Sequence, residues 1–318
     1  MHDIALDSIA TTVPRPVLCL GDSHVTYIVR AQKHFLLAPR QVSSAEVGGA
    51  TAVGFRNPNS MTDALGHYRK ALKGRAVDGV IVLQLGEVDC GYVIWYRAEK
   101  YGDAIEVQME HSVGAYFSFV DELLGLGWRH VIITGATLPT ITDTDQQGEV
   151  VRKRSGIKAT QRQRTELTLR YNERLREEAV ARGLHYVEVT HDVLDPATGY
   201  VAKRFRNRDP WDHHMRYELA AVEWARRLTP VLEAIDPLPA SWGWWRATRD
   251  TFVKAYVAHS KDMPAEMRLA VPEGAVLRAR LNAAGSEMLT LSEAMLDGTR
   301  LDERLRLIHK AHFTQLGG

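Results

Sequence analysis

A serine follows a short apolar run near the start of the chain, in the stretch VLCLGDSHV at residues 17–25. Four apolar residues are the length of a buried strand, and Gly21 allows the tight turn that would end it. Parallel-sheet proteins tend to build their sites just past a strand end. Ser23 is therefore a candidate nucleophile, although Ser23 or Asp22 could instead cap a following helix.

A serine nucleophile needs a base, because its hydroxyl reacts poorly until a neighbouring group takes the proton. Histidine can do this near neutral pH, and a carboxylate can fix the tautomer of the imidazole and stabilise the imidazolium. The stretch DPWDHHM at residues 209–215 offers both residue types twice. His213 and His214 are candidate bases, and Asp209 and Asp212 are candidate carboxylates.

The elements that must position these groups alternate along the chain. Short apolar runs rich in β-branched residues predict strands, and amphipathic stretches that end at glycine or charge predict helices. This alternation predicts an α/β fold, a three-layer sandwich with a parallel sheet covered on both faces. The predicted strands are 17–20, 78–87, 129–136 and 184–190, and the predicted helices are 60–74, 112–127, 163–183 and 218–235.

Composition changes near residue 236, where prolines and tryptophans gather. We predict a main α/β domain over 1–235 and a mostly helical C-terminal extension over 236–318, which could also mediate a homo-oligomer. A length of 318 residues with 45% hydrophobic and 25% charged residues suits such a globular chain.

Charge and hydropathy exclude several classes of protein. A formal net charge of +1 favours neither nucleic acid nor a membrane surface as partner, and no run of about 18 apolar residues predicts a membrane span. The N-terminus lacks the basic start of a secretory signal, so we expect a cytoplasmic protein. Cys19 and Cys90 have no metal-ligand spacing and predict no disulfide framework.

Four blocks of sequence, taken in order, resemble those of the SGNH/GDSL hydrolases. The resemblance covers roughly residues 16–235 and implies a flavodoxin-like SGNH hydrolase fold, serine chemistry on acyl esters, and no cofactor. The blocks are LGDSH (20–24), EVGGATAVGF (46–55), LGEVDCG (85–91) and DPWDHHM (209–215).

The resemblance also implies donors for the oxyanion that forms during acyl transfer. They would be the backbone N–H of Ser23, the backbone N–H of Gly49 or Gly48, and an asparagine side chain from the third block. Val88 stands where that asparagine would be. Another residue must then supply the third donor, and Asn57, with Asn59 beside it, is a candidate.

Three further residues of these blocks have expected roles. By resemblance, Asp89 would brace the nucleophile turn rather than take part in chemistry. Glu87 is unexplained by the family pattern, and if buried it would carry a raised pKa or pair with a cation such as Arg97. His24 directly follows the serine, and adjacent side chains diverge, so we expect it to shape the pocket.

The terminal block departs from the family's Asp-x-x-His spacing. We favour His214 as the base because an apolar residue follows it, as is usual in the family block, and His213 remains the alternative. Asp212 ranks ahead of Asp209 because side chains two positions apart face the same way along an extended segment.

These residues predict a serine ester hydrolase that acts on a small-molecule or glycan ester. An O-acyltransferase with the same residues is one alternative, and a binding protein on the same fold is another, favoured by the two departures. A metal-dependent hydrolase built on the histidine pair ranks lower, because zinc sites usually have better-spaced ligands, and we expect no metal. The basic segment 151–164 is interpreted as a solvated loop and helix start, with a lid over an anionic substrate as the alternative.

Overall fold

The structure is a computed structural model of the whole chain. It describes residues 14–33, 36–37, 40–144 and 147–238, together with short strands between 278 and 300.

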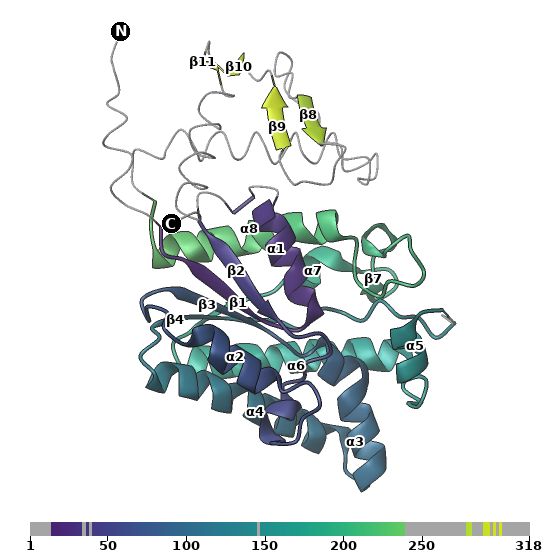
Figure 1. Cartoon of the computed structure of the whole chain (residues 1–318). Coiled ribbons are helices and arrows are strands. Elements are labelled where there is room, and N and C mark those ends of the chain that lie inside the picture. Colours follow the sequence, from purple (N-terminus) through teal and green to yellow (C-terminus); the bar gives the residue numbers. More distant parts are fainter. Residues whose placement is uncertain are drawn as a thin grey trace.

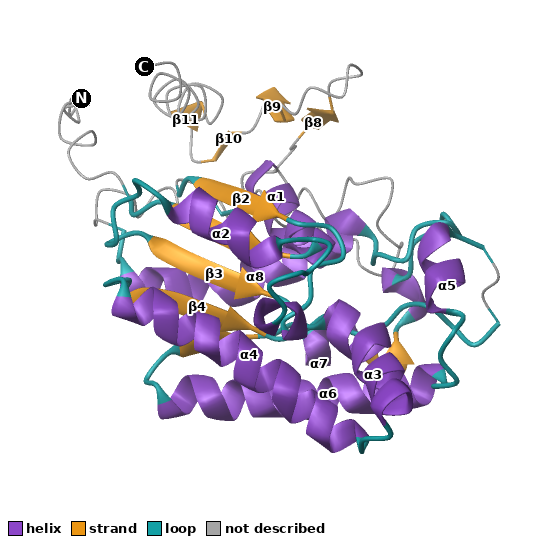
Figure 2. Cartoon of the chain, turned by 60° about the horizontal axis from the view of Figure 1, so that its bottom comes forward, coloured by secondary structure: helices purple, strands orange, loops and turns teal. Residues whose placement is uncertain are grey.

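A five-stranded sheet forms the centre of the molecule, with strand order β2-β1-β3-β4-β5 and all pairings parallel. This is the flavodoxin-like doubly wound order, in which ligands bind outside the carboxyl ends of the strands where the order reverses. The arrows of β2, β3 and β4 in Figure 2 all point the same way. The strands are β1 (Val17–Gly21), β2 (Val42–Glu46), β3 (Val80–Gln84), β4 (His130–Thr134) and β5 (His185–Val187).

Helices cover both faces of this sheet, which gives the three layers visible in Figure 1. On one face α1 (Thr26–Lys33) packs against α8 (Tyr217–Ile235). The other face carries α2 (Ala64–Leu72), α4 (Ile105–Gly125) and α6 (Gln161–Ala181). The remaining elements are η2 (Ser23–Val25), η3 (Val53–Arg56), η4 (Asp89–Val93), α3 (Ile94–Tyr101), α5 (Glu149–Arg154), α7 (Thr190–Val193), β6 (Leu194–Asp195), β7 (Tyr200–Val201) and η5 (Lys203–Phe205).

The central strands are apolar throughout because both of their faces are buried. Along β1, Val17 and Cys19 face the core beneath α1 and α8, whereas Leu18 and Leu20 face the core beneath α2, α4 and α6. Side chains alternate across a strand, so one sequence run serves two hydrophobic cores. Cys19 and Cys90 are both buried and free.

The structure contains the four predicted strands and adds a fifth, β2, which the sequence analysis did not identify as a strand. Its sequence is Val-Ser-Ser-Ala-Glu, and it lies at the edge of the sheet with side chains that are largely exposed or half-buried. An edge strand pairs on one side only and can be polar, so it lacks the apolar run that marks a buried strand.

Two predicted helix starts differ from the structure. The helix predicted over 60–74 begins at Ala64, and the residue before it is Asp63 in a left-handed conformation, so Ser60 is not its cap. The helix predicted over 112–127 begins earlier, at Ile105. Helix boundaries depend on local capping and packing, which the periodic pattern records poorly.

Helix α8 ends at Ile235, and most of the predicted helical extension over 236–318 lies outside the described residues. The described part of it forms two antiparallel strand pairs. They are β8 (Arg278–Leu281) with β9 (Leu289–Ser292), and β10 (Met295–Leu296) with β11 (Thr299–Arg300). Among the described residues, no helix combines the length and the apolar character needed to cross a bilayer.

Candidate active site

Ser23 is the first residue of the 3-10 turn η2, directly beyond the carboxyl end of β1. The cap of this turn is Asp22, whose Oδ1 accepts a hydrogen bond of 2.8 Å from the backbone N–H of His24. The backbone N–H of Asp22 donates to the carbonyl of Gln84 on β3. The capping function thus belongs to Asp22, which leaves the Ser23 hydroxyl available for another partner.

That partner is His214. Its Nε2 lies 2.8 Å from the Ser23 Oγ, and its Nδ1 lies 2.7 Å from the Asp212 Oδ1. The same carboxylate oxygen accepts a hydrogen bond of 2.9 Å from the backbone N–H of His214. Ser23, His214 and Asp212 therefore form a continuous chain of hydrogen bonds with the order that serine nucleophiles require.

Asp212 is held as a carboxylate by four donor contacts. Its Oδ2 accepts hydrogen bonds from Asn207 Nδ2 at 2.9 Å and from the Tyr217 hydroxyl at 2.8 Å. Burial by itself would raise the pKa of Asp212, but the hydrogen bonds from His214 and Tyr217 outweigh it and lower this pKa to about 2. The contacts of Asn207 and Tyr217 with Asp212 were not predicted from the sequence, because each residue is five positions from Asp212 and no motif marks either.

The loop that carries His214 is anchored on both sides. The backbone N–H of Met215 donates to the Tyr27 hydroxyl of α1 at 2.7 Å, which ties the loop to the helix that follows the nucleophile turn. The hydroxyl of Thr140, in the loop after β4, donates to the backbone carbonyl of His213. These contacts hold the imidazole at the carboxyl edge of the sheet.

Among the described residues, neither alternative within the terminal block forms a hydrogen bond with the Ser23 hydroxyl. Asp209 is exposed, and its Oδ1 accepts a hydrogen bond from the backbone N–H of Trp211, so it shapes its own turn. The ring of His213 lies beside that of His214, with 4.2 Å between centroids. Burial lowers the pKa of His213 to about 4. The hydrogen bond to the Ser23 hydroxyl comes from His214.

The loop after β2 starts beside the nucleophile turn, since the Val47 N–H donates to the Gly21 carbonyl at 3.0 Å. Gly48 and Gly49 follow and are exposed, and Gly49 has a φ of 74° that favours glycine. The Ser23 N–H opens a helical turn, and such N–H groups have no acceptor within their own helix. Backbone donors for an oxyanion are thus available in this region.

The contacts of Asn57 are local to the loop after β2. It is exposed, and its side-chain oxygen accepts a hydrogen bond from the backbone N–H of Asn59 at 3.0 Å. Its backbone contacts with Gly54 and Ser60 also stay within the same loop. The contacts of Asn57 thus serve its own turn, and its role as the third oxyanion donor stays a prediction.

Asp89 braces a different segment from the one expected. Its carboxylate accepts hydrogen bonds from the backbone N–H groups of Ala52 and Val53, at 2.8 and 3.0 Å, and from the Ser112 hydroxyl at 2.7 Å. These contacts tie the loop after β2 to α4 rather than holding the nucleophile turn. Burial raises the pKa of Asp89, and the three hydrogen bonds oppose that rise.

Glu87 is buried, and its partner is Arg154 of α5 rather than Arg97. The pair is bidentate, with distances of 2.6 and 2.7 Å between guanidinium nitrogens and carboxylate oxygens. Burial alone would raise the pKa of Glu87, but the charge and hydrogen bonds of Arg154 hold it well below its usual range. Arg97 instead donates to Gln108. Arg154 is 67 positions from Glu87, so sequence proximity pointed to the wrong cation.

Two further ionisable side chains, His24 and Glu46, lie near the nucleophile. His24, which we expected to shape the pocket, is buried, with its Nδ1 at 2.9 Å from the Asp22 Oδ1 and its ring 4.8 Å from that of His214. Glu46, the last residue of β2, was not identified from the sequence. Burial raises the pKa of Glu46, the charge of His214 lowers it, and the charge of Asp22 raises it further.

A cavity of about 140 Å³ adjoins the His214 loop. It is lined by residues 140–141, 150–151 and 206–213, so part of the basic segment contributes to its wall. Trp211 borders this cavity and is 60% exposed. Two of the six cations in the segment 151–164, Arg154 and Arg164, are buried and engaged in hydrogen bonds rather than solvated.

Three histidines of the described residues lie close enough together to be a candidate metal site. His24, His213 and His214 each place one ring nitrogen within 4.8 Å of the others. Imidazole nitrogens are common ligands for zinc and other transition metals.

Comparison with known proteins gives matches at the level of structure. No protein-family model matches the chain, and no curated protein matches it. Twenty-six solved chains match its fold. The chain is similar in fold to SGNH/GDSL hydrolases.

Three of the solved structures illustrate the similarity. A GDSL-like lipase from Bacteroides thetaiotaomicron is 13% identical, with a TM-score of 0.42, over 72% of this chain and 94% of the lipase. A carbohydrate acetylesterase from Sinorhizobium meliloti is 12% identical, with a TM-score of 0.41, over 70% of this chain and 98% of the esterase. A gut microbial diltiazem-metabolizing enzyme is 16% identical, with a TM-score of 0.44, over 69% of this chain. The chain spans only 47% of that third enzyme.

Proposed function

We propose that this protein is a serine-dependent ester hydrolase in which Ser23 is the nucleophile, His214 the general base and Asp212 the group that orients it. The observation that carries the proposal is the 2.8 Å separation between His214 Nε2 and Ser23 Oγ. This distance lies within the reach that proton transfer requires. The carboxylate on the far side of the imidazole supports the same assignment.

In this mechanism the Ser23 oxygen attacks the carbonyl carbon of the ester while its proton passes to His214 Nε2. Ionised Asp212 stabilises the resulting imidazolium through Nδ1. The carbonyl oxygen becomes an oxyanion near the backbone N–H groups of Ser23 and Gly49. One well-placed donor of this kind is worth about 3–4 kcal/mol in the transition state.

Collapse of the intermediate breaks the bond between the carbonyl carbon and the alcohol oxygen, and His214 returns the proton to that leaving alkoxide. Water then attacks the acyl-serine, and His214 again accepts and returns one proton. The carboxylic acid leaves and Ser23 regains its hydroxyl. If an alcohol takes the place of water, the same residues transfer the acyl group.

The cavity beside the His214 loop, which Asp212 and His213 help to line, is a candidate site for the leaving group, and its size favours a small one. Its volume of about 140 Å³ is below the roughly 300–1,000 Å³ of pockets that enclose drug-sized ligands. The exposed Trp211 at its border offers a flat apolar surface next to polar backbone and side-chain groups. An amphipathic ring such as a sugar suits that combination.

A fluorophosphonate probe tests the nucleophile directly, because it modifies activated serine hydroxyls. We expect stoichiometric labelling of the intact protein and hydrolysis of p-nitrophenyl acetate, with both lost in Ser23→Ala. The matched control is Ser118→Ala, since Ser118 is an exposed serine on α4 that donates only to its own helix. A folded protein that neither labels nor hydrolyses short esters would instead be a binding protein on this fold.

A further inference from the structure

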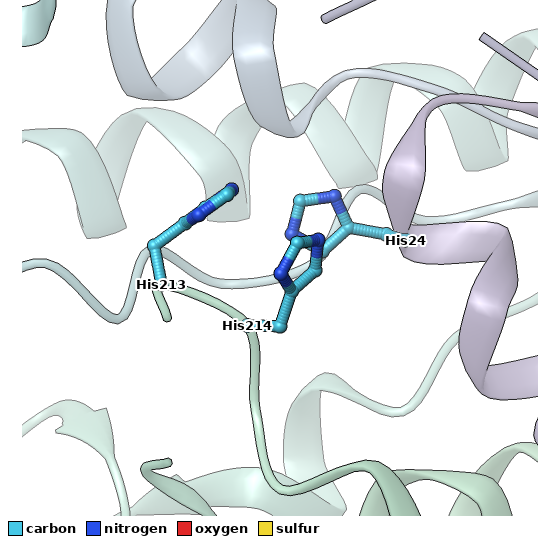
Figure 3. Close-up of side chains that lie close together, drawn as sticks. All are labelled: His24, His213 and His214. Carbon is cyan, nitrogen blue, oxygen red and sulfur yellow. The ribbon is translucent and has the colours of Figure 1, made fainter. Parts of the chain in front are cut away.

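Three imidazoles converge at the carboxyl edge of the sheet. Figure 3 shows His24 on the turn after β1 and His213 and His214 on the loop before α8, grouped in one place. Ring centroids are 4.8 Å apart for His24 and His214, 4.2 Å for His213 and His214, and 5.8 Å for His24 and His213. One nitrogen of each ring lies within 4.8 Å of one nitrogen of the others.

Two of these rings already have the carboxylate partner that is typical of metal-binding histidines. His24 Nδ1 lies 2.9 Å from the Asp22 Oδ1, and His214 Nδ1 lies 2.7 Å from the Asp212 Oδ1. A carboxylate at Nδ1 keeps the proton on that nitrogen and leaves the lone pair on Nε2. Such outer carboxylates also increase the basicity of the ligand and compensate the charge of a bound cation.

We propose that His24, His213 and His214 form a binding site for a divalent transition-metal ion of the zinc type, and that the ion inhibits ester hydrolysis by taking the Nε2 lone pair of His214. The binding site stands on the geometry alone. The inhibition rests on the proposed serine mechanism.

Zinc coordination by His214 and activation of Ser23 exclude each other, because both use the Nε2 lone pair of His214. Zinc–imidazole bonds of about 2.0–2.1 Å in a tetrahedron require ligand nitrogens roughly 3.4 Å apart. The ring nitrogens, which now lie within 4.8 Å of one another, would have to move closer together through rotation of the side chains. The fourth position would be filled by water, and His214 could no longer accept the serine proton.

Zinc binding is measured first, by isothermal titration calorimetry with zinc alone on the full chain after treatment with a chelator. We expect one zinc ion per chain for the wild type. Ser23→Ala should bind at least as tightly, because the hydroxyl that competes for His214 is gone. His213→Gln should bind at least about tenfold more weakly, since even outer-shell changes cost 10–100-fold.

The matched control is His191→Gln, because His191 is an exposed histidine outside the cluster, and its zinc isotherm should equal that of the wild type. Circular dichroism and the Tm establish that each variant is folded. Equal zinc affinity in folded wild type and His213→Gln, or no binding to the wild type, would overturn the proposed site. Where His213→Gln does not fold, His213→Asn takes its place.

Inhibition is measured next, as hydrolysis of p-nitrophenyl acetate and as probe labelling of Ser23 with zinc or with EDTA. We expect zinc to suppress both by more than tenfold at saturation, and EDTA to restore both. Activation by zinc, or loss of activity in EDTA, would overturn the inhibitory role. A protein without labelling under any condition would refute the serine mechanism and the inhibition together, while the zinc isotherm would still decide the site.

Discussion

The Ser23 hydroxyl oxygen lies 2.8 Å from His214 Nε2, although 191 positions of the chain separate the two residues. Packing of α1 against α8 produces this relationship, because Ser23 precedes α1 and His214 precedes α8. The hydrogen bond from the Met215 backbone N–H to the Tyr27 hydroxyl ties the His214 loop to α1.

Replacement of the triad carboxylate should separate the two candidate aspartates. In Asp212→Asn the amide cannot hold the imidazole in the required tautomer, and we expect kcat to fall on the order of 10³–10⁴-fold. Asp209→Asn, which alters only a local turn, should change kcat less than threefold, roughly the scale of surface substitutions. Steady-state hydrolysis of p-nitrophenyl acetate measures both. Equal losses in the two variants would contradict the assignment of Asp212.

Tyr217→Phe removes one hydrogen bond to the Asp212 carboxylate while keeping the ring. Hydrogen bonds to charged groups contribute about 1.5–3 kcal/mol, so we expect kcat to fall roughly tenfold with KM little changed. Tyr101→Phe on α3 is the control, because Tyr101 is exposed. If Tyr217→Phe has full activity, this hydroxyl does not help to hold Asp212 in place.

Removal of one partner of the buried Glu87–Arg154 pair should destabilise the fold strongly. Both side chains are buried, at 4% and 9% exposure, so Glu87→Gln would leave a buried guanidinium without its counter-ion. We expect the free energy of unfolding to fall by about 3–5 kcal/mol at pH 7. Glu122→Gln, which breaks the exposed pair with Arg69, should cost no more than about 1 kcal/mol. Urea unfolding compares them, and equal losses would exclude a special role for the buried pair.

The same pair predicts a pH dependence of stability. The folded-state pKa of Glu87 is lowered, so its contribution is fully present above the unfolded pKa of about 4.3. It is lost as the pH falls below that value toward the folded pKa. We therefore expect wild type to lose more stability than Glu87→Gln between pH 5 and pH 3. Parallel slopes for the two proteins in urea unfolding would show that Glu87 does not titrate in this way.

The layered α/β architecture could be predicted because its signal is local. Apolar runs such as those of β1 and β3 are long enough to be buried on both faces, and the helices between them are amphipathic. Edge strand β2 could not be found in this way, because its pairing with β1 through the backbone requires no apolar side chains. Most of the predicted C-terminal extension lies outside the described residues, so its helical character stays a prediction.

Candidate residues of the site could be chosen because their chemistry is restricted to a few types. A serine past a strand end and a late histidine next to an aspartate were visible in the sequence, and Asp212 was already ranked before Asp209. The partner of Glu87 was not predictable, because a buried glutamate pairs with whichever cation the fold brings to it. Here that cation is Arg154 on α5, which lies 67 positions further along the chain. The loop contacts of Asp89 and Asn57 likewise depend on backbone positions that no motif encodes.

By itself the sequence determined the alternation of buried strands with helices, the turn that carries Ser23, and the small set of residues able to do acyl chemistry, because these follow from periodicity and side-chain type. Only the tertiary structure decided which of these residues meet. It brought His214 rather than His213 to the serine and paired Glu87 with Arg154, and it gathered three histidines from two distant segments. Such distances are set by the packing of helices on a common sheet, which no local stretch of sequence specifies.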